Sequence, residues 1–112
     1  MAEHQLMKNI DKKTVLTLKD EVTYQAGQVV SKTLAQNDAV SVTLFAFDAG
    51  EQISSHKAAG DAFITCLDGE GVITIDDDKF TVTAGNSIVI PAGAPHAVDA
   101  TTQYKMMLVV IY

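Results

Sequence analysis

The stretch that decides the fold is GNSIVIPAGAPH, residues 85–96. It places a glycine turn, a short apolar run and a loop bracketed by Pro91 and Pro95 directly before His96. Glycine adopts positive φ at little cost, and proline fixes φ and removes a backbone donor where no strand pairing continues. The stretch therefore predicts a strand, a stiff loop, and a second strand that starts at His96.

An earlier stretch, residues 50–69, has a related layout. Five residues separate Gly50 from His56, and the stretch closes at Gly69. His56 comes after Ile53-Ser54-Ser55 and is expected to begin or precede a strand.

The rest of the chain is dominated by a hydrophobic period of two, which is typical of strands. Val40, Val42, Leu44 and Ala46 alternate with the residues between them across 40–47. Further strands are predicted over 14–18, 29–35, 62–67, 71–75, 79–83, 87–90, 96–100 and 104–111, with turn sequences at 48–50, 68–71, 76–78, 84–86 and 91–95. Several short strands at near-regular spacing indicate an all-β sandwich or barrel, and exposed strand edges favour closure.

Composition agrees with one domain. The chain has 112 residues, of which 47% are hydrophobic and 20% charged, enough for one core. We expect residues 13–112 to form a single-domain barrel, with 1–12 as a flexible N-terminal arm or a strand swapped with a partner subunit.

Charge and cysteine content exclude several classes of function. The net charge of −6 opposes binding to nucleic acid or to anionic membrane surfaces. The N-terminus has no apolar run of signal-peptide length, and the longest apolar run, 106–112, is too short to span a membrane. The single cysteine, Cys66, forms no internal disulfide, so a cytoplasmic location is the simplest expectation.

The two stretches resemble the two conserved motifs of the cupin superfamily. Residues 85–96 keep every spacing of the second motif up to its histidine, His96, and Gly50, His56 and Gly69 match the first motif. The resemblance covers about residues 39–112. It implies an all-β cupin jelly-roll barrel of the small one-domain type, with both histidines at metal-ligand positions facing the cavity. In such a barrel the two strands lie side by side at the mouth, so the resemblance also implies that the imidazoles of His56 and His96 converge.

The motifs also depart from the family pattern. Alanines stand at the second histidine position, the glutamate position and the terminal asparagine position, namely Ala58, Ala62 and Ala100. Catalytic zinc commonly keeps three protein ligands, and non-haem iron oxygenases use two histidines and a carboxylate. Two imidazoles with water predict weak, low-occupancy binding of a divalent transition metal (Ni, Cu, Zn, Fe or Mn), with copper or nickel favoured over iron or manganese.

Three residues are candidates for a missing third ligand. Asp61 faces outward by alternation, and a bulge at Gly60 would turn it toward the histidines. Cys66 faces inward but lies about 13 Å further along the strand, so a buried core thiol is the favoured interpretation. His4, in the arm, would have to reach the mouth of a neighbouring subunit.

The same alternation predicts the inner wall of the cavity. Ser54 and Ala58 share the parity of His56, Val98 shares that of His96, and Ile64 shares that of Ala62. These residues form a small, apolar binding surface, which suits a small and partly apolar molecule. Lys57 is expected to face outward, Asp76-Asp77-Asp78 to form a solvated hairpin, and one of Met106 and Met107 to face the cavity.

The sequence leaves three functions open. The first is a binding module that holds a small molecule in the barrel beside a weak or degenerate metal site on His56 and His96. The alternative is a metal-dependent enzyme, a dioxygenase or isomerase, that completes its ligand set with Asp61, water or substrate. The third is a structural or regulatory partner protein. A homodimer is expected because the segment 29–35 or the final strand would otherwise leave an apolar sheet exposed, whereas nucleic acid and membrane are not expected as partners.

Overall fold

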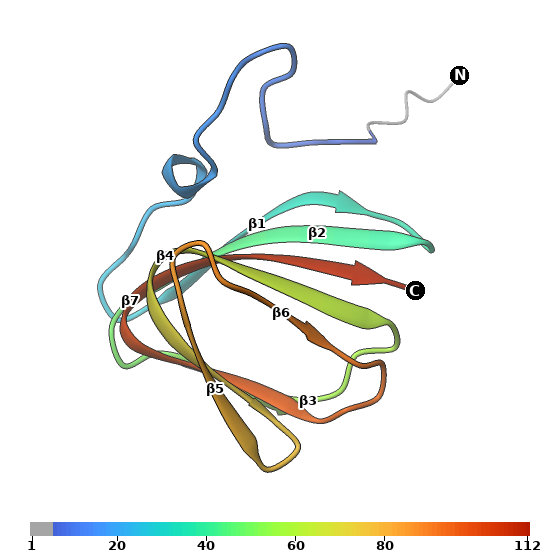
Figure 1. Ribbon diagram of the computed structural model, residues 1–112. Coiled ribbons are helices and arrows are strands. Elements are labelled where there is room, and N and C mark those ends of the chain that lie inside the picture. The colour runs from blue at the N-terminus through green and yellow to red at the C-terminus, as the bar shows by residue number, and fades with distance from the viewer. Residues whose placement is uncertain (1–5) are drawn as a thin grey trace.

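The computed structural model describes residues 6–112, which fold as an all-β jelly-roll barrel (Figure 1). The elements are η1 (Leu18–Glu21), β1 (Val29–Gln36), β2 (Val40–Phe47), β3 (Gln52–His56), β4 (Asp61–Ile75), β5 (Asp78–Thr83), β6 (Ser87–Ile90) and β7 (His96–Ile111). The strand predicted over 14–18 is wrong, because these residues form an irregular segment that enters the 3-10 turn η1. Within the described residues no helix is long and apolar enough to cross a membrane.

Two long strands, β4 and β7, form the spine of the barrel. They pair antiparallel over their whole lengths, from Asp61 opposite Ile111 to Ile75 opposite His96. Each had been predicted as two shorter strands with a turn or gap between them. Each strand instead continues without a break, β4 through 68–71 and β7 through 101–103, and the register of their pairing shifts twice in this region. These irregularities bend both strands, so each contributes to both layers of the barrel (Figure 1).

Glycines allow the bend. Gly69 has φ +71°, and a Cβ there would lie 1.7 Å from the carbonyl oxygen of Gln103 on β7. Gly71 lies against the ring of Tyr104, which a Cβ would approach to 2.9 Å. Close contact between the strands at this point therefore requires residues without a side chain.

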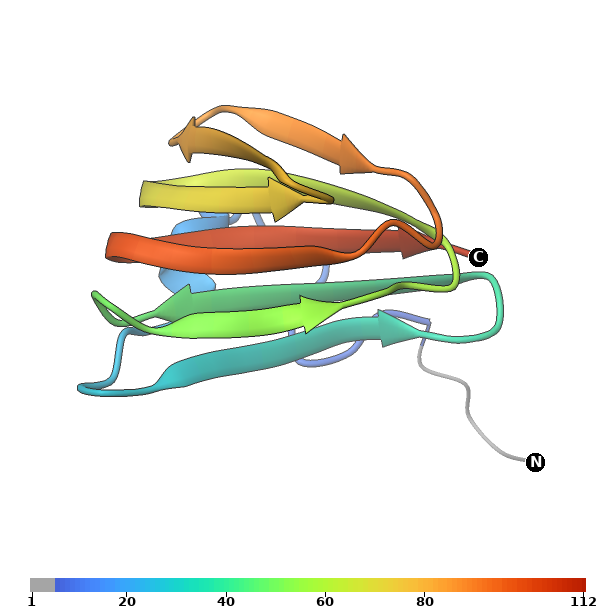
Figure 2. The ribbon, with the colours of Figure 1, turned by 90° about the horizontal axis from the view of Figure 1, so that it is seen from below.

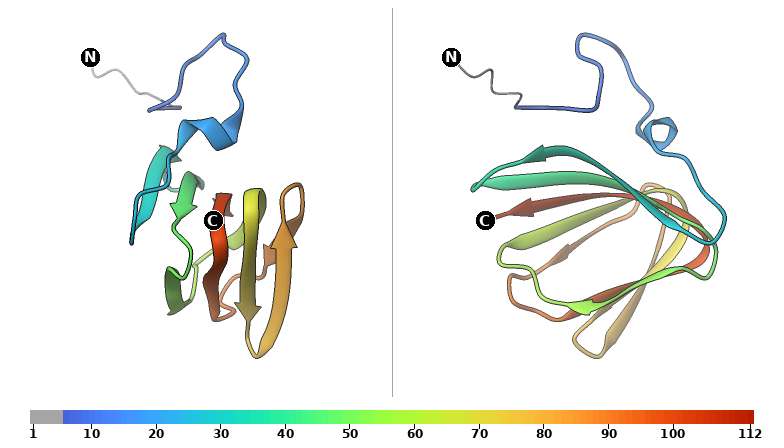
Figure 3. Two further views of the ribbon diagram at one scale, coloured as in Figure 1. Left: turned by 90° about the vertical axis from the view of Figure 1, so that its left-hand side faces the viewer. Right: turned by 180° about the vertical axis from the view of Figure 1, so that it is seen from behind.

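The bent pair organises two layers. In the first, β1, β2, the second half of β7, the first half of β4 and β6 lie side by side. In the second, β3, the first half of β7, the second half of β4 and β5 do so. Figure 1 and the right view of Figure 3 show these layers diverging from the bend toward the end of the barrel that holds the 91–95 loop, and Figure 2 shows the strands side by side from below.

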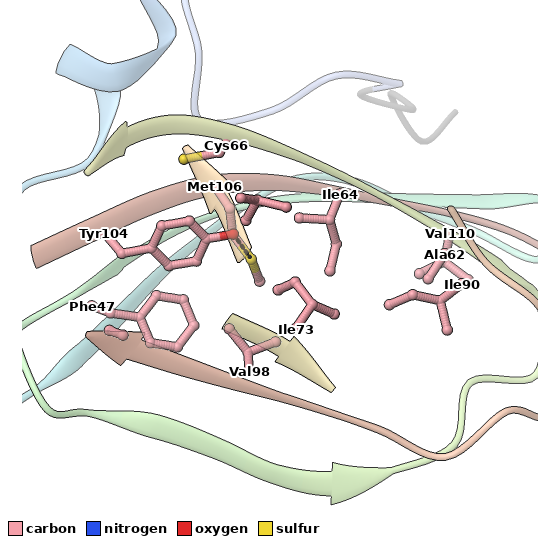
Figure 4. Packing of buried hydrophobic residues seen from close by; sticks show 12 residues of the cluster. Phe47, Ala62, Ile64, Cys66, Ile73, Ile90, Val98, Tyr104, Met106 and Val110 are labelled. Carbon is pink, nitrogen blue, oxygen red and sulfur yellow. Dashed lines mark hydrogen bonds between the residues drawn. The ribbon is translucent and has the colours of Figure 1, made fainter. Parts of the chain in front are cut away.

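The main core fills the space between the layers (Figure 4). Phe47 and Tyr104, both fully buried, stack with ring centroids 5.5 Å apart, and the Tyr104 hydroxyl donates to Met106 Sδ at 3.4 Å. Ala62, Ile90 and Val110 lie at the opposite end of the cluster. Burial of apolar surface on both inner faces is what holds the layers together.

A second, smaller core lies on the outer side of the first layer. Leu44 and Ala46 of β2, which were expected to alternate between core and solvent, are buried there together with Val22 and Leu34. Ile10 and Tyr24 pack against this cluster from the N-terminal segment. Both sides of β2 are therefore buried, one by the barrel and the other by the chain that precedes β1.

The N-terminal segment contacts the rest of its own chain at several points. The Lys8 amide donates to the Leu34 carbonyl at 2.8 Å, and the Asn9 side-chain amide donates to the Thr33 carbonyl at 2.8 Å, which places both residues beside β1. Further along, the Tyr24 hydroxyl donates to Asp68 at 2.6 Å, and Lys105 lies 4.7 Å from the centre of the Tyr24 ring. Burial and the Asp68 carboxylate raise the pKa of Tyr24, so the donor keeps its proton. Residues 1–5, including His4, lie outside the described residues.

Substitution of Gly69 tests the bend. We expect Gly69→Ala to lower the free energy of unfolding by at least about 3 kcal/mol, since it adds left-handed strain to a collision with backbone. Gly27→Ala is a matched control, because Gly27 has φ +70° with nothing within 4 Å of the added Cβ. The control should cost only about 1 kcal/mol. Equal losses in urea denaturation would show that close strand contact at Gly69 does not matter.

Candidate functional site

The two predicted histidines meet at the open end of the second layer. His56 is the last residue of β3 and His96 the first of β7, and the two residues pair directly across the sheet. Their ring centroids are 4.3 Å apart, with the ring planes inclined by 57°. The prediction that the imidazoles converge is confirmed. His56, which is expected to begin or precede a strand, is the last residue of β3 and precedes β4 by a short loop.

The loop before His96 is held at both sides. The Gly93 amide donates to the Ala58 carbonyl at 3.0 Å, just beyond β3, and the Asp76 amide donates to the Pro95 carbonyl at 2.8 Å, just beyond β4. The Ala92 amide donates to the Asp61 carboxylate at 2.8 Å. These three bonds join the loop to neighbouring elements and set the position from which His96 enters β7.

Hydrogen bonds define which ring nitrogens are available. Nδ1 of His56 lies 3.1 Å from the Ser54 carbonyl, and Nδ1 of His96 lies 3.1 Å from the Ala94 carbonyl. A carbonyl only accepts, so each Nδ1 carries the proton and donates it. In the neutral rings both Nε2 atoms then keep a lone pair, as metal-ligating histidines do. Each ring is oriented by the same contact, two residues back along its own chain.

The two rings differ in burial. His96 exposes 4% of its surface, whereas His56 is exposed. Its partner ring and the loop cover His96, so a ligand would approach from the His56 side. Ile75, directly opposite His96 on β4, is partly buried and packs against the core. Sequence reasoning did not single out Ile75, although alternation from the buried Ile73 places its side chain on the inner face of the sheet beside His96.

Within residues 6–112, the structure brings no third ligand to the pair. Asp61 faces outward at the start of β4, pairs in register with Ile111, and uses a carboxylate oxygen to hold the loop amide of Ala92. The bulge that would turn Asp61 inward is absent, because Asp61 and Ala62 pair with Ile111 and Val110 without a register shift. Gly60 is buried, and a Cβ there would lie 2.0 Å from the Ile111 carbonyl oxygen. Among residues 6–112, no three His, Cys, Asp or Glu side chains are grouped to hold a metal ion.

Cys66 is a core thiol. It is buried near the bend, with Sγ 3.5 Å from the carbonyl oxygens of Asp68 and Gly69. Burial raises the pKa of this thiol, which keeps it protonated and a poor metal ligand. Met106 joins the main core and Met107 packs against the outer cluster, so one faces each side as expected. Lys57 and the hairpin 76–78 are exposed.

The predicted cavity wall is mostly closed core. Ala62 and Ile64 expose 1% of their surfaces and Val98 exposes 2%, so their inward orientation is confirmed but no open space adjoins them. Ala58 is partly buried at the mouth. The inward placement of Ser54 is wrong: the register shifts between Ile53 and His56, Ser54 is exposed, and Ile53 packs against the core instead. Alternation identifies a side of the sheet, but not how far opposite side chains fill the interior.

Comparison with known proteins places these features in a family. The Cupin domain family matches residues 43–112. No curated protein matches the sequence. A conserved protein of unknown function from Streptococcus pyogenes shares 39% identity over 98% of this chain and 96% of its own, with a TM-score of 0.94.

Two other solved structures show a strong and a more distant likeness. A cupin superfamily protein from Desulfitobacterium hafniense is 33% identical over 94% of this chain and 96% of its own, with a TM-score of 0.90. A salicylate 1,2-dioxygenase from Pseudaminobacter salicylatoxidans is 15% identical over 84% of this chain and 30% of its own, with a TM-score of 0.69, a likeness of fold alone. With both motifs, the barrel and the family match in agreement, this chain belongs to the cupin family.

Proposed function

We propose that this cupin binds a small molecule at the mouth of its barrel through His56 and His96, which also hold a divalent transition metal weakly. The observation that supports this most directly is the pair of imidazoles 4.3 Å apart, each with Nδ1 bonded to a carbonyl. In the neutral rings that arrangement leaves a lone pair on each Nε2, on two imidazoles that lie next to each other. Packing alone would not require both rings to be held by the same type of hydrogen bond from Nδ1.

The donor set suits a weakly held metal. Two imidazole nitrogens would be completed by water, whereas structural zinc sites use four protein ligands and catalytic ones three. Nitrogen ligands favour copper and nickel over iron and manganese. A metal at this place would supply a Lewis acid to polarise a ligand oxygen. The protein's own part is to orient both rings and to keep His96 nearly free of solvent.

A metal-dependent dioxygenase or isomerase is the second candidate. It would take its third ligand from water or from substrate, because Asp61 is engaged with the loop. The same two Nε2 atoms support it, but the described residues supply no carboxylate to the pair. We therefore rank binding above catalysis.

Removal of either imidazole tests the paired site. We expect His56→Ala and His96→Ala each to weaken Ni²⁺ or Cu²⁺ binding by at least about tenfold, since losing a ligand costs no less than losing its supporting contact. Isothermal titration of chelator-treated protein measures the affinity, which we expect to be micromolar or weaker in the wild type. Lys57→Ala is the control, because Lys57 is an exposed neighbour of His56. Full metal binding by either histidine variant would rule out a shared site.

Asp61 variants separate support from ligation. If Asp61 only holds the loop, Asp61→Ala should weaken metal binding by less than about tenfold, cost about 1 kcal/mol of stability, and speed hydrogen exchange at the Ala92 amide. Asp61→Asn should largely restore all three properties, because its amide oxygen can accept the same bond. A loss as large as that of the histidine variants, without rescue by asparagine, would make Asp61 a ligand.

We also propose a homodimer. An exposed apolar side chain on the first layer supports this proposal. Ile111 of β7 pairs with Val40 on one side and Asp61 on the other, and it exposes 55% of its surface on the outer side of the layer. The other segment expected to drive pairing, 29–35, is largely covered by the chain's own N-terminal segment. We expect sedimentation equilibrium to give twice the chain mass at micromolar concentration, and Ile111→Lys to shift it toward monomer. A monomeric wild type at that concentration would contradict the proposal.

A further inference from the structure

Phe80 is an aromatic side chain on the inner side of the barrel that the barrel does not cover. It lies in β5 directly opposite Ile73, a fully buried residue of the main core, and side chains of paired residues lie on the same side of a sheet. Val82, two residues further along β5, is also buried in that core. Phe80 nevertheless exposes 42% of its surface.

The topology explains this exposure. β5 is the last strand of the second layer, whereas β6, which follows it in the chain, pairs with β4 in the first layer. β5 ends and β6 begins at the turn 84–86, and the two strands lie on the same side of the molecule (Figures 2 and 3). Val82, close to that turn, is covered. Phe80, farther from it, is left half open.

Phe80 lies on the same face of the layer as the histidine pair. His96 pairs with Ile75 on β4, and Ile75 pairs with Asp78 on β5. Phe80, two residues after Asp78, is therefore the diagonal neighbour of Ile75, at about 7–8 Å between Cα atoms. Along this face an apolar surface made by Ile75 and Phe80 runs on from the two imidazoles.

We propose that Ile75 and Phe80 form the apolar part of the ligand site and that the ligand is a small, uncharged aromatic compound carrying a hydroxyl group. The inference rests on the function proposed above. A ring on the ligand would stack against Phe80, and its burial would contribute the larger share of affinity. Since each Nδ1 donates to a carbonyl, the neutral Nε2 atoms accept, and the matching ligand group is a donor.

Local charge favours a hydroxyl over a carboxylate. Asp78 lies opposite Ile75, and Asp61 binds the loop that leads to His96. The exposed Asp76, Asp77 and Asp78 of the adjoining hairpin outnumber the exposed Lys57 and Lys79. A ligand carboxylate would approach these acidic residues unfavourably, whereas a neutral hydroxyl carries no such cost.

Binding of 2-naphthol to the metal-free full chain tests the inference, with 2-methoxynaphthalene as the probe that lacks the donor. We expect fluorescence titration to show 2-naphthol binding, about tenfold weaker binding of the methyl ether, and a Kd about three- to tenfold higher in Phe80→Ala. Phe63→Ala is the matched control. Phe63 exposes 44% of its surface but lies between the buried Ala62 and Ile64, so it faces the outer side. Its substitution should leave the Kd unchanged.

The outcomes separate this inference from the function it rests on. If the histidine variants weaken metal and 2-naphthol binding while Phe80→Ala does not, the aromatic subsite is wrong and the histidine site stands. If 2-naphthol does not bind the wild type, or binds no better than its ether, the proposed ligand class is wrong, whatever the metal titration shows. If the histidine variants change neither, the proposed function fails. Phe80→Leu, which keeps apolar volume without a ring, carries the same test should Phe80→Ala unfold.

Discussion

The continuous pairing of β4 with β7 is the constraint on which the rest of the structure depends. These strands hydrogen-bond to each other from the mouth to the bend and back into the other layer, and every other strand except β1 pairs with one of them. Because both strands change layer at the same place, the two sheets are covalently continuous at the bend. The layers diverge from there, which is why the barrel is tightly packed at Tyr104 and open at the histidines.

The site is a consequence of that geometry. β7 starts at His96 and β3 ends at His56, so the rings meet only because both strands terminate at the open end. The loop 91–95 bonds to Ala58, Asp61 and Asp76, residues that follow β3, begin β4 and follow β4. Each bond therefore ties His96 to the same spine. The outer core made with the N-terminal segment supports the first layer from behind and leaves this end open.

Departures from the family pattern have a common physical effect. Ala58, Ala62 and Ala100 replace polar ligand positions, and two of them are fully buried in the apolar core. A buried carboxylate without a metal would be costly, whereas alanine at these positions packs without penalty. The chain thus keeps an exposed His56 and a buried His96, and it lacks polar ligands at the buried positions 62 and 100. The stable core and the weak metal site that we propose follow from the same substitutions.

Sequence alone determined the all-β class, the second motif and its stiff loop, the inward side of Ala62, Ile64 and Val98, and the pairing of His56 with His96. These depend on alternation, turn chemistry and spacing, which act locally. Only the tertiary structure decided that β4 and β7 each run through a bend, that a register shift turns Ser54 outward, that Asp61 holds a loop, and that Phe80 is left half open. Such features depend on which strands become neighbours and on how side chains from distant segments fill the space between layers, and a local pattern does not specify either.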